Sequence, residues 1–191
     1  ELVDGGIRHS PWWFASRDHT DPGRGGRFDL AAPMGTCYLT TRPEAALLES
    51  IQAYLINLPQ AELAVRRLAS MKAPHDAPDA AMLTASKASG IFGLTAELWA
   101  GRNRALTQAW AAAMRRDGWW AAYGGVSHDP SGRLRSVALF DSAGEHQPTH
   151  GAHWYYRSTP IDGDAALERA LARYGVRVRE PGQLPWAGPP A

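Results

Sequence analysis

Apolar residues recur at helical spacing after residue 43, where we expect a helix to begin. Thr41-Arg42-Pro43-Glu44 is a capping-box pattern with an early proline, and Pro59 is the next signal that ends a helix. The expected apolar face consists of Leu47, Ile51, Tyr54, Leu55 and Leu58. Glu49 lies about 160° around the helix from Leu47. We therefore expect the Glu49 carboxylate to face solvent or a cleft.

Two later segments also have helical periodicity. Residues 103–116 place four apolar side chains on one face, and two arginines followed by Gly118 suit the end of a helix. The four side chains are Leu106, Trp110, Ala113 and Met114. Residues 164–174 form a shorter amphipathic pattern, and strand-like residues 176–178 follow. We predict a helix over each of the two segments.

Strand patterns occupy other parts of the chain. Residues 37–40 are typical of a short strand. Residues 119–126 and 134–140 predict two strands joined by a turn that contains Asp129-Pro130-Ser131-Gly132. Residues 63–71 alternate only weakly and are a less certain strand.

Prolines and glycines indicate segments without regular structure. We expect an irregular segment over residues 11–35, a loop over 72–80 and a loose tail over 181–191, while residues 82–94 remain ambiguous. A length of 191 residues suits one domain with a substantial core. The predicted fold class is one α+β domain over residues 1–180, followed by the tail.

Charge and composition exclude several classes of partner. The formal net charge is +1, so no strong field favours nucleic acid or an anionic membrane. No apolar run approaches the ~18 residues that span a membrane. No signal peptide is visible, so we expect a cytoplasmic protein, or the domain of a secreted effector that is delivered there. Cys37 is the only cysteine, and its apolar neighbours predict a buried structural thiol.

Four short phrases carry the candidate chemistry. They are Gly26-Arg27-Phe28-Asp29, Cys37-Tyr38-Leu39-Thr40, Glu44-Ala45-Ala46-Leu47-Leu48-Glu49 and Gly125-Val126-Ser127-His128-Asp129. Arg27, Tyr38, Glu49 and Ser127 supply a cation, an aromatic face, a carboxylate and a hydroxyl. Such groups can hold a dinucleotide and help to break its glycosidic bond. Each residue alone would be an ordinary loop, strand, helix or turn residue, so only the combination indicates a site.

These phrases, in this order and at these distances, resemble the RES-domain family, which is named for its Arg, Glu and Ser. The resemblance covers most of residues 7–140. Arg27, Tyr38, Glu49 and Ser127 take the positions of the family's Arg, Tyr, Glu and Ser. Arg8 resembles a further family arginine at the first strand. The run over residues 121–126, before the serine, differs from the family's usual pattern.

The resemblance implies a fold, an activity and a partner. The fold would be similar to that of ADP-ribosyltransferases, with a mixed or split β-sheet core and flanking helices. The activity would be that of a bacterial toxin that consumes NAD by hydrolysis or phosphorolysis, with no metal or prosthetic group. A helical antitoxin or an immunity protein would cover the active site. An alternative within the family is transfer of ADP-ribose to a protein.

The resemblance also implies a role for each residue. Loss of nicotinamide leaves positive charge on the ribose, and Glu49 would stabilise this oxocarbenium-like centre. Arg27 and Arg8 would hold the diphosphate, because guanidinium groups bind phosphate through two parallel hydrogen bonds. Tyr38 would stack on the cationic nicotinamide ring, and Ser127 would position the ribose or the carboxamide.

A different class of function remains open, namely a non-catalytic module that binds a partner. Eight tryptophans are present, and an exposed Trp12-Trp13-Phe14 cluster would give such a module, or a transferase, a docking surface.

Other patterns are weaker. His146, His150 and His153 have a metal-like spacing, but Pro148 and Gly151 argue against the helix it would require. Ser127 and His128 are neighbours on an extended strand and should point to opposite faces, which disfavours a Ser/His pair. The glycine-rich run over residues 23–27 lacks the flanking strand and helix of a P-loop, yet it suits close contact with a diphosphate.

Overall fold

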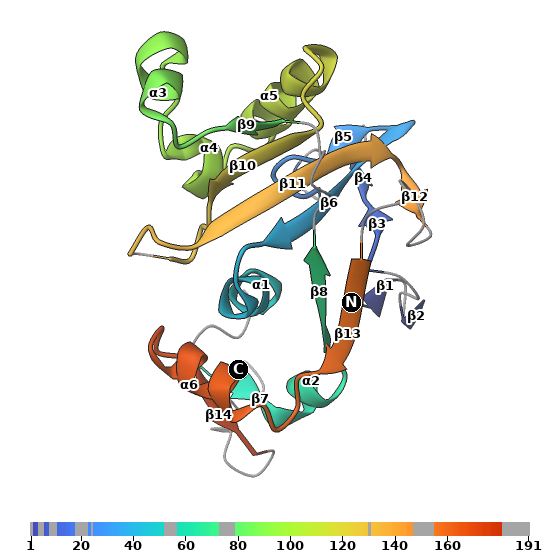
Figure 1. Ribbon diagram of the computed structural model, residues 1–191, viewed down its shortest axis with the longest axis vertical. Coiled ribbons are helices and arrows are strands. Elements are labelled where there is room, and N and C mark those ends of the chain that lie inside the picture. The colour runs from blue at the N-terminus through green and yellow to red at the C-terminus, as the bar shows by residue number, and fades with distance from the viewer. Residues whose placement is uncertain are drawn as a thin grey trace, which may run out of the picture.

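A four-stranded sheet in the order β6-β11-β10-β9 organises the fold (Figure 1). Its strands are β6 (Met34–Thr40), β11 (Arg135–Ser142), β10 (Ala121–Gly125) and β9 (Ala80–Met82). Within this sheet, the β10–β9 pair is parallel and the other two pairs are antiparallel. The computed structural model describes residues 2–3, 6–7, 11–17, 23, 25–51, 57–72, 79–129, 131–146 and 155–180. Strands and helices together confirm the predicted α+β class, and the proposed tail over 181–191 lies outside the described residues.

The predicted strands at residues 37–40, 119–126 and 134–140 are confirmed as β6, β10 and β11. Strand β9 begins at the end of the predicted loop over residues 72–80. Its three residues show no hydrophobic pattern that predicts a strand. They form one because β10 provides partners for their backbone hydrogen bonds. The ambiguous segment after β9 contains the helix α3 (Ser86–Phe92).

Helix α1 (Pro43–Ser50) begins where the proline predicts, but the capping box does not form. Arg42 is the N-cap residue and makes no side-chain capping bond, while the Thr41 hydroxyl donates to the Arg135 carbonyl at 3.5 Å. The predicted extension of the helix to Pro59 is wrong. Residues 57–59 instead form β7 (Asn57–Pro59), which pairs in parallel with β14 (Arg177–Arg179) from the far end of the sequence.

The C-terminal elements pack against α1 at the end of the molecule remote from α5 (Figure 1). They include β13 (Tyr155–Pro160) and α6 (Ala165–Ala172), which begins at the N-cap residue Asp164 as predicted. Strand β13 pairs with β8 (Arg67–Lys72), which follows the short helix α2 (Gln60–Ala64). The weak strand prediction over residues 63–71 is therefore only partly correct.

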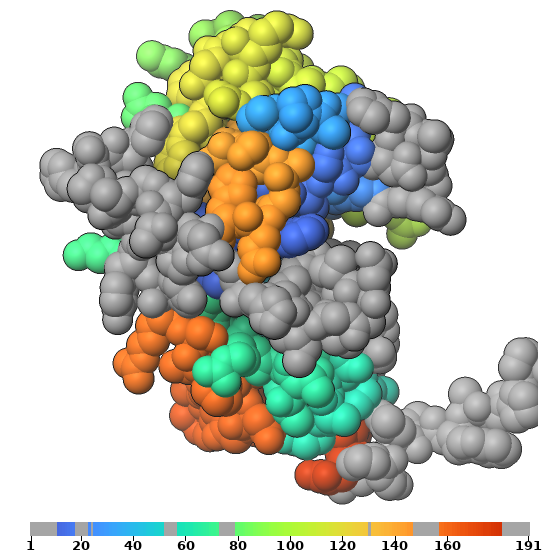
Figure 2. Space-filling model, turned by 90° about the vertical axis from the view of Figure 1, so that its right-hand side faces the viewer, coloured from blue at the N-terminus to red at the C-terminus, as the bar shows by residue number. Residues whose placement is uncertain are grey.

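Five short strands come from the described part of the N-terminal region. They are β1 (Leu2–Val3), β2 (Gly6–Ile7), β3 (Trp13–Phe14), β4 (Ser16–Arg17) and β5 (Leu30–Ala31). Strands β3, β4 and β5 contact β6, whereas β1 and β2 lie beside β13 (Figure 1). Strand β3 pairs with β12 (Gly144–Glu145), so the orange and dark-blue residues meet in Figure 2. Trp12 and Phe14 are only 6% and 4% exposed. The predicted exposed cluster at residues 12–14 is therefore wrong, because two of its three rings fill the core.

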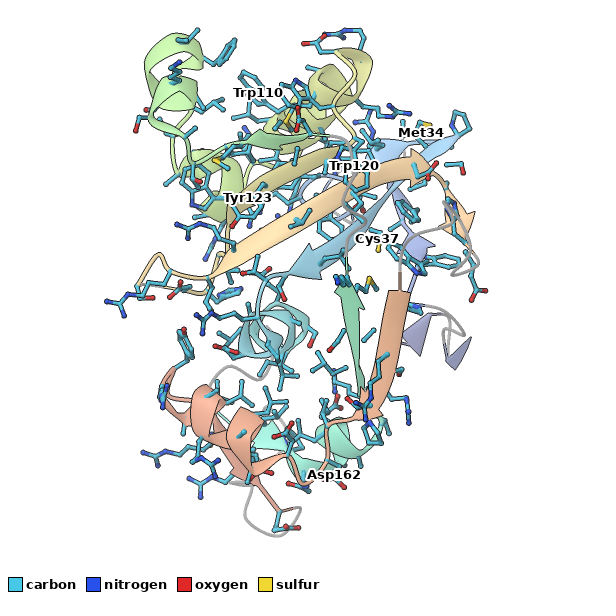
Figure 3. All side chains as sticks on the ribbon, in the orientation of Figure 1. Met34, Cys37, Trp110, Trp120, Tyr123 and Asp162 are labelled. Carbon is cyan, nitrogen blue, oxygen red and sulfur yellow. The ribbon has the colours of Figure 1, made fainter. Side chains whose placement is uncertain are left out.

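The two faces of the sheet have different neighbours. Cys37, Leu139 and Ala121 share the face that packs against Trp12 and Phe14, and the predicted burial of Cys37 is confirmed. The opposite face carries Tyr38, Ala138 and Ala122 and is covered by α5 (Arg104–Arg116) and α4 (Glu97–Ala100). Figure 3 shows Trp110 and Cys37 on these two sides of the sheet.

Helix α5 has the predicted limits but a different buried face. Its N-cap residue Asn103 accepts a hydrogen bond from the Leu106 N–H at 3.0 Å. Leu106 is 42% exposed, whereas Thr107 and Gln108 are buried. The apolar face predicted through Leu106 and Trp110 is therefore rotated in the structure, because the Gly26 carbonyl accepts a hydrogen bond from the Gln108 amide and so permits its burial.

No helix among the described residues is sufficiently long and apolar to cross a lipid bilayer.

Asp129 shapes the turn between β10 and β11. Its buried carboxylate accepts hydrogen bonds from the Leu134 N–H at 2.6 Å, the Ser131 N–H at 2.9 Å and the Ser131 hydroxyl at 2.5 Å. Burial by itself opposes ionisation, but these hydrogen bonds outweigh it and lower the pKa of Asp129. The carboxylate therefore stabilises the fold above the ordinary value of 3.8, and this stabilisation is lost as the pH falls through the folded-state pKa.

We expect Asp129→Asn to lower the free energy of unfolding at pH 7 by about 1–3 kcal/mol, because buried donors lose an acceptor. The difference from the unmodified chain should narrow as the pH falls toward 3. Urea unfolding at several pH values measures both quantities, with the exposed Asp117→Asn as control. A difference that stays constant with pH would rule out the contribution of the Asp129 charge.

Candidate functional site

The Arg27 loop is shaped around the hydroxyl of Tyr38. The buried Asp29 carboxylate accepts hydrogen bonds from the Gly26 N–H at 2.5 Å and from the Tyr38 hydroxyl at 2.7 Å. The Tyr38 oxygen in turn accepts from the Phe28 N–H at 2.8 Å. A Cβ atom on Gly26 would lie 2.5 Å from the Tyr38 oxygen. Glycine is therefore required for this close approach of loop and strand.

Tyr38 presents its ring to solvent while its hydroxyl stays enclosed. The residue is 44% exposed, although its oxygen bonds to both Phe28 and Asp29. Burial of the hydroxyl, followed by the negative charge of Asp29 and its hydrogen bond, raises the pKa of Tyr38 well above its usual value. Tyr38 is thus a neutral ring held in a fixed orientation at the surface of the site.

Ser127 links two of the other predicted residues, Arg27 and Glu49. Its hydroxyl accepts a hydrogen bond from Arg27 Nη2 at 3.0 Å and donates to the Trp99 carbonyl at 3.0 Å. Its backbone N–H donates to Glu49 Oε1 at 2.9 Å. Ser127 lies just beyond β10. A Cβ atom on Gly125, at the end of that strand, would lie 2.6 Å from the Trp99 ring, so glycine allows the ring to pack there. One residue therefore joins the cation, the carboxylate and the end of α4.

Glu49 comes from the last turn of α1. Its neighbours Leu47 and Leu48 are buried in the core, whereas Glu49 itself is only half-buried and turns toward Ser127. The expectation that the carboxylate lies off the apolar stripe is confirmed. Its charge is therefore available to the site and is not required by the core.

Arg27 lies in a half-buried position between several elements. Besides Ser127, its guanidinium donates to the carbonyl of Gly101, just after α4. Burial lowers the pKa of Arg27, and the nearby positive charge of Arg104 lowers it further, while Glu49 has the opposite effect. The Gln108 amide holds the same loop in place by donating to the Gly26 carbonyl at 3.0 Å.

The structure thus brings Arg27, Tyr38, Glu49 and Ser127 together from four separate segments. Arg8 lies outside the described residues. The sequence reasoning missed Asp29, Trp99, Arg104 and Gln108. Asp29 stands within one of the four phrases, but its hydrogen bond to Tyr38, nine residues later, could not be predicted from the sequence. No sequence motif near Arg104 or Trp99 indicates a role in the site. Gln108 was missed because the periodicity of α5 predicted that a different face of the helix is buried.

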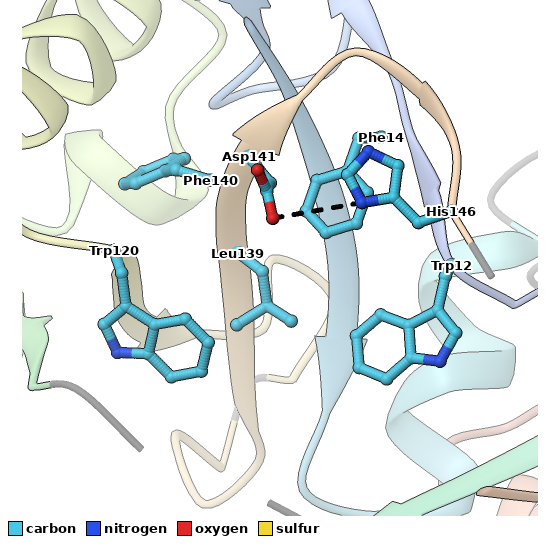
Figure 4. Close-up of a pocket in the computed structure, with 7 residues that line it drawn as sticks. All are labelled: Trp12, Phe14, Trp120, Leu139, Phe140, Asp141 and His146. Carbon is cyan, nitrogen blue, oxygen red and sulfur yellow. Dashed lines mark ion pairs between the residues drawn. The ribbon is translucent and has the colours of Figure 1, made fainter. Parts of the chain in front are cut away.

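The weaker candidates form no metal site and no Ser/His pair in the described part of the chain. His146 stacks on Phe14 with ring centroids 4.4 Å apart, in the small pocket of Figure 4. The pocket lies on the face of the sheet that carries Cys37 and Leu139, and Tyr38 belongs to the opposite face. His150 and His153 lie outside the described residues. Within the part of the chain that the structure describes, no three His, Cys, Asp or Glu side chains form a group that could hold a metal ion. The Ser127 hydroxyl bonds to Arg27 and Trp99, and no bond joins it to His128 among the described residues.

The arrangement suits a ligand that is anionic at one part and cationic at another. Arg27 and Arg104 provide positive charge, the Tyr38 ring provides a flat exposed surface, and Glu49 provides negative charge close to Arg27. Half-burial strengthens these electrostatic effects relative to open solvent. The site could therefore bind an anion and stabilise a cationic centre a short distance away.

One comparison with known proteins identifies the family of this chain. A family model described as the RES domain matches residues 6–159, a range that includes Arg27, Tyr38, Glu49 and Ser127. Comparison with curated proteins gave no match, and comparison with solved structures gave none either. Because the matched region covers most of its length, this chain belongs to the RES-domain family.

Proposed function

We propose that this chain is a toxin that cleaves NAD+ at the bond between nicotinamide and ribose. The RES domain is associated with toxin function that involves NAD. The observation that carries the proposal is the linkage of Arg27 and Glu49 through Ser127, at 3.0 Å and 2.9 Å. A phosphate-binding cation and a carboxylate are thereby held at a fixed separation, as a dinucleotide with a cationic ring requires.

In the proposed reaction, the bond between the ribose C1 atom and the nicotinamide nitrogen breaks, and its electron pair leaves with the ring. Nicotinamide departs as a neutral molecule, so it needs no general acid. Positive charge moves to the ribose, where the Glu49 carboxylate stabilises it more strongly than it stabilises the bound substrate. Water or phosphate then bonds to C1, and attack by water releases one proton.

The other residues bind and orient the substrate. Arg27 holds the diphosphate, with Arg8 as a second proposed contact. The exposed Tyr38 ring stacks on nicotinamide, and the hydrogen bond from the Tyr38 hydroxyl to Asp29 fixes the orientation of the tyrosine ring. Ser127 positions the ribose, because its hydroxyl lies between Arg27 and the end of α4.

The same site chemistry would serve the transfer of ADP-ribose to a protein, in which a side chain replaces water as the acceptor. A transferase needs a docking surface for its target. The cluster at residues 12–14 no longer supports one, because Trp12 and Phe14 are buried. Hydrolysis or phosphorolysis is therefore preferred to transfer, and both are preferred to a non-catalytic binding module.

The decisive experiment is incubation of the purified chain with NAD, with nicotinamide followed by chromatography. We expect nicotinamide and ADP-ribose to be released in equal amounts. When inorganic phosphate is added, ADP-ribose 1-phosphate should replace ADP-ribose if the reaction is a phosphorolysis. Release that requires an added cell extract, with ADP-ribose attached to protein, would identify a transferase. A folded chain that releases no nicotinamide under any of these conditions would overturn the enzyme assignment.

The proposed cellular setting follows from this activity. An enzyme that depletes NAD stops growth without any other target, so we propose that it acts on the cytoplasmic NAD pool. We further propose that an antitoxin or immunity protein restrains it by covering Arg27, Tyr38 and Glu49. The exposed Tyr38 ring would be the natural contact for such a partner.

A further inference from the structure

Arg104 is the first residue of α5 and lies next to the Arg27 loop. Gln108 follows one helical turn later on the same face of the helix, and its amide donates to the Gly26 carbonyl at 3.0 Å. The adjacent residue, Arg27, bonds to the carbonyl of Gly101, only three positions before Arg104 in the sequence. Two independent contacts therefore bring the start of α5 against the loop that carries Arg27.

The charges agree with this placement. After burial, Arg104 is the neighbour that lowers the pKa of Arg27 most, and it also acts on the Tyr38 hydroxyl. Glu49 and Glu97 act on Arg27 in the opposite direction, each less strongly than Arg104. In the described part of the chain, no carboxylate forms an ion pair with Arg104, although its side chain is half-buried.

Two guanidinium groups that face one half-buried site repel each other. An anion that contacts both groups offsets this repulsion, because each guanidinium group is then attracted to the negative charge. A single phosphate can satisfy one guanidinium fork through two parallel hydrogen bonds. Two neighbouring forks are matched by a ligand with two linked phosphates, which is the bridge of a dinucleotide.

We propose that Arg104 is a second diphosphate-binding residue that acts together with Arg27, so that the site selects dinucleotides over nicotinamide mononucleotide. This inference rests on the proposed function, because it assigns a part of the same substrate. The ring and ribose of the mononucleotide would still meet Tyr38 and Glu49. Its single phosphate would leave one guanidinium group without an anion.

The test uses calorimetric titration of a Glu49→Gln background, which should bind ligand without consuming it. The ligands are NAD, nicotinamide mononucleotide and nicotinamide riboside, which carry two, one and no phosphates. Arg104→Ala should weaken NAD binding by about 10- to 100-fold, as expected for loss of charged hydrogen bonds. Binding of nicotinamide riboside should be unchanged, and the preference for NAD over the mononucleotide should shrink.

Arg102→Ala is the matched control, since Arg102 is exposed and two positions away. It removes the same charge from the same segment, and we expect NAD affinity to stay within about twofold. Equal weakening by both variants, or NAD binding unaffected by Arg104→Ala, would overturn the role of Arg104 and leave the proposed function standing. A background that binds none of the three ligands would instead count against the proposed function itself. Arg104→Gln replaces the alanine variant if thermal unfolding shows that the latter is not folded.

Discussion

Replacement of Glu49 by glutamine should lower the rate of nicotinamide release by about 10²–10³-fold, the usual effect of losing one well-placed electrostatic stabiliser. The glutamine oxygen can still accept the hydrogen bond that the Ser127 N–H donates to Glu49 at 2.9 Å. The variant should therefore keep the arrangement of the site and lose only its negative charge. Its thermal unfolding should match that of the unmodified chain, because Glu49 is not part of the core.

Glu44→Gln is the control for this change. Glu44 belongs to the first turn of the same helix and forms an ion pair with Arg42 at 3.8 Å, away from Ser127. Its loss should leave nicotinamide release within about twofold. If a folded Glu49→Gln variant released nicotinamide at the rate of the unmodified chain, Glu49 would have no part in the reaction.

The same pair of variants tests the toxin proposal in cells. Bacteria that express the unmodified chain or Glu44→Gln should lose NAD before they stop dividing, while Glu49→Gln cells should keep both NAD and growth. If growth stopped at constant NAD, depletion would not be the toxic activity. Modification of a specific protein would then become the preferred explanation.

Replacement of Arg27 by lysine should fail to restore the NAD binding that Arg27→Ala loses. Two different nitrogens of Arg27 donate to the Gly101 carbonyl and to the Ser127 hydroxyl, which fixes the plane of the guanidinium group. A lysine ammonium is a single point of charge and cannot keep both contacts while it also holds a phosphate. We expect both variants to bind NAD about 10- to 100-fold more weakly than the background does.

Titration of Glu49→Gln chains with NAD measures these affinities. Arg133→Lys is the control, since Arg133 is exposed on the turn between β10 and β11. If Arg27→Lys bound NAD as tightly as the arginine form, recognition of phosphate through the guanidinium fork would be wrong.

Local signals along the chain were sufficient to predict several elements. Asn103 and Gly118 frame α5, and Pro43 marks the start of α1, because capping groups and a fixed backbone angle act within a few residues. The hairpin of β10 and β11 was predicted for the same reason, since its turn and its two strands are adjacent in sequence. The family could also be predicted, and four candidate site residues proposed, because the order and spacing of the motifs are properties of the sequence itself.

Contacts between distant residues decided the rest. Helix α1 ends at Ser50 and not at Pro59, because residues 57–59 pair with β14, about 120 positions later in the chain. Trp12 and Phe14 were expected at the surface, but the face of the sheet that carries Cys37 and Leu139 buries them. Periodicity measures only the pattern of one element and contains no information about what packs against it.

The site follows the same division. The sequence by itself determined that Arg27, Tyr38, Glu49 and Ser127 were candidates, but not how they contact one another. Only the tertiary structure placed Ser127 between Arg27 and Glu49, across separations of 100 and 78 residues. It also turned Gln108 inward and brought Arg104 to the Arg27 loop, because the Gly26 and Gly101 carbonyls needed donors that only distant side chains could supply.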